Sequence, residues 1–573
     1  MLLEFHNGKF NITDIKFGEH LIEASNFTIL YYGILSRNVT EKQLKDALTS
    51  NPNTKSLEDF FNNGYFVVTY DKGRNSITMH RDISGIKTGY YYLEKENLLV
   101  STNMHQIAAI TKTTFSPVWV DSYIYNHFIF DGYTFYNNIF EVNIGESIQI
   151  ELNTFKKNIF FQELPILYEE AKLTEQQCIQ ELRNKILKTF ERLYGDNNVV
   201  YLSGGIDSCV ILAALYNICP DKLRCVSYCI KDGKQNETIY AKYAADFLST
   251  KLDVIEVDPN MPDLVQNFES IVLQQNLPYD GMYTVEPQKQ TDNELFFAGQ
   301  DTRLHTPAVG VLESMLMNSI INQNKSLNVS TDNIIHLLVE LQRKGLNIHK
   351  FISRLCDNEA ALNYAFFSLS QAKYKRYNFN PRHLTELLYY TKINFDHKSN
   401  LRAIYNDMVA VRWKKQYTND IRYMVDMGNR KQCHILLPFY DPELAIFSST
   451  LPWDYATKRV NGFDKFSQKK VSVDKFLLRK AFEKEISDKV LYRAKATSDD
   501  YLLMYQGTLK KVILQILNDD RSSTKSFMRE YGFNEYIQKN IFDNPNWTLH
   551  YRECKTALNT AICCVLFANI NRA

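Results

Sequence analysis

The segment SGGIDS, residues 203–208, constrains the fold more than any other feature of the chain. It follows the run NVVYL at 198–202 and precedes the run CVILAAL at 209–215. The first run has the β-branched and aromatic character of a buried strand, and the second continues as an apolar helix. The segment therefore lies at a strand-to-helix turn, where phosphate groups bind in α/β sheets.

The residue types in this segment suit a nucleotide polyphosphate. Two successive glycines allow close backbone approach without a Cβ clash, and the helix N-terminus supplies N–H donors. Ser203 and Ser208 can add hydroxyl donors. Asp207 would repel a phosphate directly but suits a hard cation held against phosphate oxygens. The segment therefore predicts a site for a nucleotide polyphosphate together with Mg²⁺.

Two well-known phosphate loops do not describe this segment. No lysine follows the glycines, as the Walker pattern GxxxxGK[ST] needs, and GxGxxG is absent here. A tight turn capped by Ser203, without any ligand, is the structural alternative. The strand and helix on either side favour the phosphate loop.

Four sequence blocks carry a resemblance to a known family. SGGIDS resembles the signature of ATP-pyrophosphatases, which cleave ATP between its α and β phosphates and adenylate a substrate. Residues 64–71 with 81–86 resemble the "GxFAFxxYD…RDxxG" stretch of class B asparagine synthetases, and 437–444 (LPFYDPEL) resemble their "VPFLDxxL". Residues 475–482 and 490–495 resemble their "KxxLRxAF…RxK". The chain is identified as a member of this superfamily, which includes β-lactam synthetases and lasso-peptide cyclases.

The resemblance implies an α/β protein of two domains. Residues 1–160 would form a degenerate glutaminase-like (class II amidotransferase) domain, an inactive Ntn-hydrolase-like αββα sandwich. Residues 173–573 would form a doubly wound parallel-sheet ATP-pyrophosphatase domain with a largely helical C-terminal extension beyond about residue 310. Periodicity supports strands at 27–32, 65–70 and 147–152, helices at 41–48 and 119–127, and a polar connection at 153–173. A helix at 175–193 and strand-helix alternation over 198–298 complete the expectation.

Composition narrows the partners and the compartment. The net charge is +1, and the basic clusters at 373–376 and 412–415 are short, so solvated surfaces are favoured over nucleic-acid contact. The N-terminus lacks signal-peptide character, and no run of eighteen apolar residues occurs, which predicts a soluble cytoplasmic protein without a membrane partner. Ten cysteines begin at Cys178 without metal-binding spacing, which predicts free thiols.

Glutamine hydrolysis is not expected of the N-terminal domain. In the family, the nucleophile is a cysteine in second position, exposed when Met1 is removed, but this chain has Leu2 there and no cysteine before Cys178. Leucine has no substitute chemistry for a thiolate. Glutamine use is therefore excluded unless a separate subunit provides it. β-Lactam synthetases and lasso cyclases share this loss, and their amine comes from the substrate itself.

The resemblance also implies a set of nucleotide-binding and metal-binding residues. Asp207 would be the first Mg²⁺ ligand. Asp301 is the candidate for the second, in the segment AGQDTR at 298–303, where the family carries "GEGxDE". That motif is shortened here and both family glutamates are missing, so Asp301 as a simple loop cap is the alternative. The implied cofactor-binding residues are Leu202, Ser203, Gly204, Gly205, Asp207, Ser208, Ser227, Tyr228 and Gly299.

Two basic residues are the catalytic candidates. Lys495 matches the lysine that, in relatives, stabilises negative charge as the amine attacks the acyl-adenylate. A solvated lysine in a polar stretch is the alternative. Arg493 could assist with pyrophosphate, although an arginine there would otherwise be expected on the surface. Arg303 and His305 are further candidates for pyrophosphate or substrate contact.

The sequence thus predicts an ATP- and Mg²⁺-dependent C–N ligase that adenylates a small-molecule or peptide carboxylate and couples it to an amine. Lasso-peptide or β-lactam closure in natural-product biosynthesis is the first specific hypothesis, with a partner peptidase or carrier protein if the substrate is a peptide. Ammonia-dependent asparagine synthesis is the second. It is weakened because residues 434–436 (HIL) replace the family's "ExR". A non-catalytic nucleotide- or partner-binding relative is the third.

Overall fold

The computed structural model of the 573-residue chain describes residues 1–300, 418–493 and 508–517, with short gaps. The gaps are 7–8, 51–56, several positions between 115 and 131, 234–236, 259, 279–285 and 466–467. Single residues between 406 and 413 and between 539 and 567 are also described.

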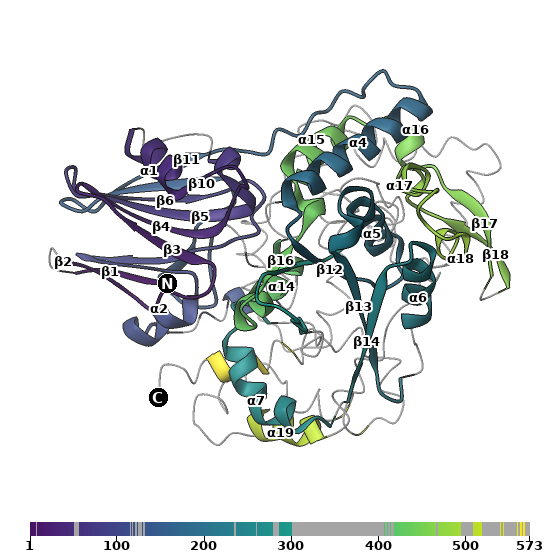
Figure 1. The fold of residues 1–573 in the computed structure, drawn as a ribbon. Coiled ribbons are helices and arrows are strands. Elements are labelled where there is room, and N and C mark those ends of the chain that lie inside the picture. The colour runs from purple at the N-terminus through teal and green to yellow at the C-terminus, as the bar shows by residue number, and fades with distance from the viewer. Residues whose placement is uncertain are drawn as a thin grey trace, which may run out of the picture.

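The N-terminal part consists of two stacked antiparallel sheets (Figure 1). One sheet has the strand order β2-β1-β8-β7-β9, and the other has the order β11-β10-β6-β5-β4-β3. Helix α1 (Glu41–Ser50) packs on the second sheet and α2 (Met104–Thr111) on the first. The strands are β1 (Leu2–His6), β2 (Lys9–Thr13), β3 (Glu19–Glu23), β4 (Phe27–Leu35), β5 (Phe61–Asp71), β6 (Ser76–Arg81), β7 (Tyr90–Glu94), β8 (Asn97–Ser101), β9 (Ile139–Glu141), β10 (Glu146–Glu151) and β11 (Lys156–Phe161).

A five-stranded parallel sheet forms the second part of the molecule, in the order β14-β13-β12-β15-β16. Helix α5 packs on β12 and β13, and α6 packs on β13 and β14 (Figure 1). These elements are β12 (Asn197–Tyr201), α5 (Ile206–Ile218), β13 (Leu223–Ile230), α6 (Thr238–Phe247), β14 (Lys251–Val257), α7 (Pro262–Leu273), β15 (Glu294–Phe297) and β16 (His434–Leu436). The remaining elements include three helices and a hairpin. The helices are α4 (Glu175–Leu193), α14 (Thr418–Arg430) and α17 (Phe476–Ala481), and the hairpin consists of β17 (Val460–Asp464) and β18 (Lys469–Val473).

Helix α4 shows how local sequence sets an element. Thr174 caps its N-terminus through a capping box with Gln177, which satisfies two backbone donors that the first turn would otherwise leave unpaired. Its buried side chains recur every three or four residues along one face, as an amphipathic helix requires. They include Cys178, Leu182, Ile186 and Phe190. The helix spans the predicted residues 175–193.

The predicted fold class is confirmed, with stacked antiparallel sheets followed by a doubly wound parallel sheet. One prediction was wrong. The segment 153–173, expected to be a polar connection, contains the edge strand β11 at 156–161. The fifth parallel strand, β16, was not predicted because it has only three residues. The C-terminal stretch predicted to be helical lies mostly outside the described residues.

A buried charge cluster joins the two parts. Arg81 at the end of β6 and Arg422 on α14 each donate to Oε1 of Glu141 at 2.5 Å. All three side chains are largely buried, with 2%, 6% and 16% of their surface exposed. Nearby, the indole N–H of Trp413 donates to the Ile83 carbonyl at 2.6 Å. The N-terminal sheets are therefore fixed against α14 by buried polar contacts.

No helix among the described residues combines the length and apolar character that a membrane crossing needs.

Candidate nucleotide site

The predicted phosphate loop lies between β12 and α5. The strand ends at Tyr201, and Gly205 is the residue from which α5 begins. Gly204 has a φ of +71°, a left-handed conformation that favours glycine, and an added Cβ would come within 2.4 Å of the Tyr240 Cβ and 2.6 Å of the Ala241 nitrogen. The loop thus packs directly on the first turn of α6. Backbone N–H groups of the loop and of α5 gather here, as anion binding at a helix N-terminus requires.

The two serines of the loop bond mainly within it. The Ser203 Oγ lies 3.2 Å from the Ser208 Oγ and accepts from the Gly205 N–H at 3.2 Å. The Ser208 hydroxyl donates to the Gly205 carbonyl at 3.0 Å. Leu202 is buried, and its N–H donates to the Val226 carbonyl of β13 at 2.8 Å. These contacts fix the shape of the loop, and the Ser203 hydroxyl is the one nearer its exposed side.

Asp207 is in the first turn of α5 and is bound by Lys475. The Lys475 ammonium donates to both carboxylate oxygens, at 2.5 and 2.6 Å. Lys475 has a left-handed backbone (φ +61°) directly before α17, and only 12% of its side chain is exposed. A cation thus lies against the carboxylate for which the sequence predicts a divalent metal.

Arg493 lies behind the loop. Its guanidinium donates to the Gly204 carbonyl at 3.1 Å, is paired with Glu237, and stacks 3.6 Å from the centroid of the Tyr240 ring. It is 6% exposed, so the expectation of a surface arginine was wrong. Because the guanidinium bonds a loop carbonyl, it orients the backbone of the loop; direct contact with pyrophosphate remains a prediction.

The strand predicted to lie beside the adenine is β13. Ser227 is buried at 2% exposure, opposite Val254 of β14. Tyr228 is partly buried, and its hydroxyl donates to the Glu286 carbonyl at 2.5 Å. The strand continues two residues beyond Tyr228. The Tyr228 ring is therefore held at the carboxyl end of the sheet, and its contact with adenine remains a prediction.

The segment that carries the predicted second metal ligand starts beside Asp207. A Cβ placed on Gly299 would lie 3.0 Å from the Ser208 nitrogen and 3.1 Å from the Asp207 carbonyl carbon. The segment after β15 thus passes against the first turn of α5. Asp301, Arg303, His305 and Lys495 lie outside the described residues, so their predicted roles stay predictions.

The described residues fit an ATP·Mg²⁺ complex in part. They contain no group of three or more side chains arranged to hold a metal. Of the two predicted ligands, Asp207 lies within the described residues and Asp301 outside them. Mg²⁺ at phosphate-binding sites is commonly held by one or two carboxylates together with the phosphates. The glycine cradle, the helix N-terminus and Asp207 match that pattern.

Sequence reasoning missed two residues of the site, Lys475 and Glu237. Lys475 is within the block that resembles "KxxLRxAF", but nothing in its local sequence shows that it reaches Asp207, 268 positions away. Glu237 is the residue before α6, where an acid is common for reasons of helix stability. The partner of each becomes visible only in three dimensions.

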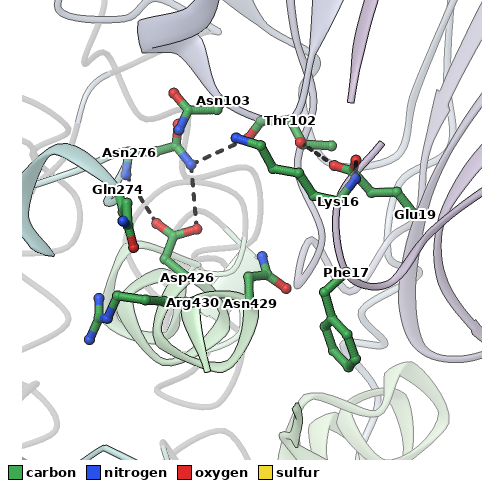
Figure 2. A pocket seen from close by; sticks show the side chains of 10 residues that line it. All are labelled: Lys16, Phe17, Glu19, Thr102, Asn103, Gln274, Asn276, Asp426, Asn429 and Arg430. Atoms are coloured by element: carbon green, nitrogen blue, oxygen red, sulfur yellow. Dashed lines mark hydrogen bonds between the residues drawn. The ribbon is translucent and has the colours of Figure 1, made fainter. Parts of the chain in front are cut away.

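A separate cavity of about 260 Å³ lies between the two parts of the molecule (Figure 2). Asn276 connects its walls, because it donates to Asp426 of α14 through its backbone N–H at 3.0 Å and to the Thr102 carbonyl through its side chain at 3.3 Å. Burial raises the pKa of Asp426 to about 6. Asn276 thus ties helix α14 to the N-terminal part, which suits a structural interface.

Comparison with known proteins gives the family. The asparagine synthase family matches residues 182–279 and 322–558, more than half of the chain, and the glutamine amidotransferase domain matches residues 54–161. The phosphate loop falls inside the first match. The chain belongs to the asparagine synthase family, whose broad class is the ATP-dependent C–N ligases.

Two curated proteins are similar over part of their length. "Amidase chry2" of Gibberella zeae is 25% identical over 230 residues, which cover 37% of this chain and 34% of that protein. "Putative asparagine synthetase (glutamine-hydrolyzing) 2" of Methanocaldococcus jannaschii is 27% identical over 201 residues, covering 33% and 38%. The matches thus span little more than a third of either relative.

Proposed function

We propose that this chain is an ATP- and Mg²⁺-dependent amide synthetase that adenylates a substrate carboxylate and joins it to an amine without hydrolysing glutamine. The observation that carries the proposal is the loop at 203–208, with Asp207 and Lys475 at its mouth and Arg493 behind it. Family membership supports the broad class. The identity of both substrates belongs to the proposal.

The chemistry has two balanced steps. In the first, a carboxylate oxygen attacks the α phosphorus of ATP, the bond between that phosphorus and the bridging oxygen breaks, and pyrophosphate leaves. In the second, the amine nitrogen attacks the acyl carbon, the bond to the AMP oxygen breaks, and the amine proton is released. The first step develops negative charge on the leaving pyrophosphate, which preorganised donors stabilise best.

The described residues supply such donors. The N–H groups in the first turn of α5 would bind the leaving phosphate, because a helix leaves its first N–H groups without an intrahelical partner. Lys475 can turn from Asp207 to a phosphate oxygen, since its flexible stem ends in three donors. Mg²⁺, when bound by Asp207, would neutralise phosphate charge. Arg493 bonds the Gly204 carbonyl and so fixes the backbone of the loop.

The amine is proposed to come from the substrate. The sequence has no cysteine before Cys178, and Leu2 lies in β1, paired with Ser101 of β8, where the family carries its nucleophile. Lasso-peptide or β-lactam closure, as in natural-product biosynthesis, is the preferred form. A cytoplasmic enzyme with a partner peptidase or carrier protein fits a peptide substrate.

Ammonia-dependent synthesis of asparagine is the less favoured alternative. Residues 434–436, which replace the family's "ExR", form β16, and Ile435 and Leu436 are 2% and 1% exposed. Burial lowers the pKa of His434 to about 3, so its ring is neutral at pH 7. These three residues therefore offer no cation to a free amino-acid carboxylate.

Pyrophosphate and AMP release from ATP and Mg²⁺ tests the proposal. The protein is incubated with leader-containing peptides, with small amino-acid carboxylates, and with aspartate plus ammonium. Release that depends on one carboxylate, and is lost in Asp207→Asn, establishes adenylation, and the product's mass gives the amide. Activity only with aspartate plus ammonium would replace the preferred form by asparagine synthesis.

If no substrate gives pyrophosphate or AMP release, and calorimetry detects no ATP binding, the proposal is contradicted and a non-catalytic relative is favoured. Asp207→Asn keeps the shape of the side chain and removes its charge, so it tests the metal ligand with little change in packing. Lys242→Gln, at a lysine in α6 for which no pairing role is proposed, is the matched control for a general effect of charge.

A further inference from the structure

Strand β11 exposes an apolar surface at the edge of its sheet. It is the terminal strand of the order β11-β10-β6-β5-β4-β3, so one of its sides has no neighbouring strand among the described residues. Ile159, Phe160 and Phe161 are 45%, 54% and 62% exposed. We call these three residues together with Lys157 the β11 edge. Exposed edges of this composition pair readily with other strands.

The other edges of the two N-terminal sheets are protected differently. Strand β2 exposes alternate polar residues, Lys9, Asn11 and Thr13. Strand β3 begins and ends with glutamate. Strand β9 has only three residues. Charge, polar alternation and short length are the usual protections of a sheet edge, and β11 lacks them at its C-terminal end.

The backbone of β11 is ready for a further strand. The Gln162 N–H donates to the Gly145 carbonyl at 2.8 Å. Every second residue of β11 counted back from Gln162, including Phe160, therefore directs its backbone N–H and C=O groups to β10. In an antiparallel ladder the intervening residues point their N–H and C=O groups the other way. Among the described residues, the backbone N–H and C=O groups of Lys157, Ile159 and Phe161 therefore have no strand to pair with.

We propose that the β11 edge pairs with the same edge of a second copy of this chain, giving a two-fold symmetric dimer. In an antiparallel pairing with two-fold symmetry, the same face of both sheets lies on the same side. Residues whose side chains point to the same face of the sheet therefore lie opposite one another. The register centred on Ile159 places this residue against Ile159 of the second copy. It also places Lys157 of each copy against Phe161 of the other.

The aromatic surroundings of the Lys157 ammonium favour this register. Its ammonium lies 5.5 Å from the centroid of the Tyr91 ring and 5.8 Å from that of Phe140, on the face that packs towards the other sheet. Phe161 of the second copy would add a third ring beside the same cation, an arrangement that stabilises ammonium groups. The register also keeps the two Lys157 side chains apart, at opposite ends of the pairing.

Six-residue strands bury a small interface, so the dimer should be weak, with a dissociation constant on the order of 10 µM. The phosphate loop lies in the other part of the molecule, so the pairing leaves it accessible (Figure 1). The proposal does not depend on the enzymatic function proposed above.

Sedimentation velocity of the full chain from about 1 to about 100 µM tests the dimer. Ile159→Pro removes an outward N–H without touching the ladder to β10, and it should raise the dissociation constant at least about tenfold. Phe161→Lys places a cation opposite Lys157 and should have a similar effect. Phe463→Lys, at an equally apolar but unrelated exposed position on β17, should change nothing.

A charge swap tests the register. Combining Phe161→Lys with Lys157→Glu places opposite charges against each other across the pair, and association should return to near the wild-type value. A wild-type chain that stays monomeric at the highest concentration would overturn the proposal. A dimer that ignores the β11 variants, or that the charge swap fails to restore, would overturn it as well. Circular dichroism of each variant confirms folding.

Discussion

Lys475 binds both carboxylate oxygens of Asp207, at 2.5 and 2.6 Å, and thereby joins the segment before α17 to the first turn of α5. The Lys475 and Asp207 side chains are 12% and 26% exposed. Partial burial strengthens such a pair relative to one on the open surface. The candidate metal ligand therefore has a counter-charge and a fixed orientation before any nucleotide binds.

Replacing Lys475 by methionine should slow pyrophosphate release about 100-fold. In the proposed reaction this lysine donates to the leaving phosphate, and loss of one such donor costs about 3 kcal/mol of transition-state stabilisation. The rate at saturating ATP and substrate is the measurement. Lys480→Met is the matched control, since Lys480 lies in α17, which directly follows Lys475, and pairs with the exposed Glu483. Equal losses in both variants would contradict a specific role for Lys475.

Glu237→Gln should weaken ATP binding while leaving the fold intact. Glu237 holds Arg493, and Arg493 in turn holds the Gly204 carbonyl. With the charge removed, the loop loses part of its preorganisation, and the KM for ATP should rise about five- to tenfold, a coupling of about 1–1.4 kcal/mol. Steady-state kinetics at varied ATP measure this effect.

A role in positioning predicts a particular kinetic pattern for this variant. The change should appear mainly in the KM for ATP, with the KM for the carboxylate substrate unchanged. Arg493→Gln should give the same change, and the double variant should cost little more than either single one because both act through one contact. Additive effects would show that the two residues act independently.

Gly204→Ala should abolish ATP binding and lower the free energy of unfolding by about 1–3 kcal/mol. The φ of +71° disfavours any side chain, and the new Cβ would collide with the backbone and the Cβ of α6 residues, which cannot yield as a flexible side-chain end could. Chemical denaturation and calorimetric titration with ATP measure the two effects. Gly73→Ala is the control, because its added Cβ would meet only the Asp71 Oδ1, at 3.4 Å. In this variant the free energy of unfolding and the affinity for ATP should stay near the wild-type values.

Much of the fold was predictable because its signals are local. The capping box and the apolar face of α4 define that helix from its own residues, and the β-branched run before SGGIDS defines β12. Strand β11 was missed because Lys156, Lys157 and Asn158 make it look polar, and its pairing with β10 decides its structure. Strand β16 is stabilised only by its neighbour β15.

The site was predictable in part for the same reason. The loop 203–208 and its glycines are contiguous in sequence, so their chemistry could be inferred directly. Lys475 and Glu237 could not be assigned, because each acts through a partner more than 200 residues away. Arg493 was wrongly expected on the surface, because the burial of its side chain depends on contacts with Tyr240 and Gly204, which lie far from it in sequence.

Lys87→Met should stabilise the protein at pH 7 by about 1–3 kcal/mol. Lys87 is 3% exposed, and burial lowers its pKa to about 8. The lysine of the unfolded chain has an ordinary pKa near 10.4, so between about pH 8 and pH 10.4 the unfolded chain binds more protons than the folded protein. The free energy of unfolding of the wild type therefore rises with pH in this range. The advantage of the variant should therefore shrink towards zero by about pH 10.5. Urea denaturation at several pH values measures it, and a difference independent of pH would contradict this account of Lys87.

Glu141→Gln should lower the free energy of unfolding by about 3 kcal/mol, because it leaves Arg81 and Arg422 buried without a negative partner. These arginines come from the two parts of the molecule, so the loss should also loosen the junction, and limited proteolysis should cut the variant faster in the connection at 162–173. Glu96→Gln, at an exposed turn between β7 and β8, should match the wild type in both measurements. If Glu141→Gln unfolds at the wild-type urea concentration, the cluster adds specificity to the junction without adding stability, as buried ion pairs do in some proteins.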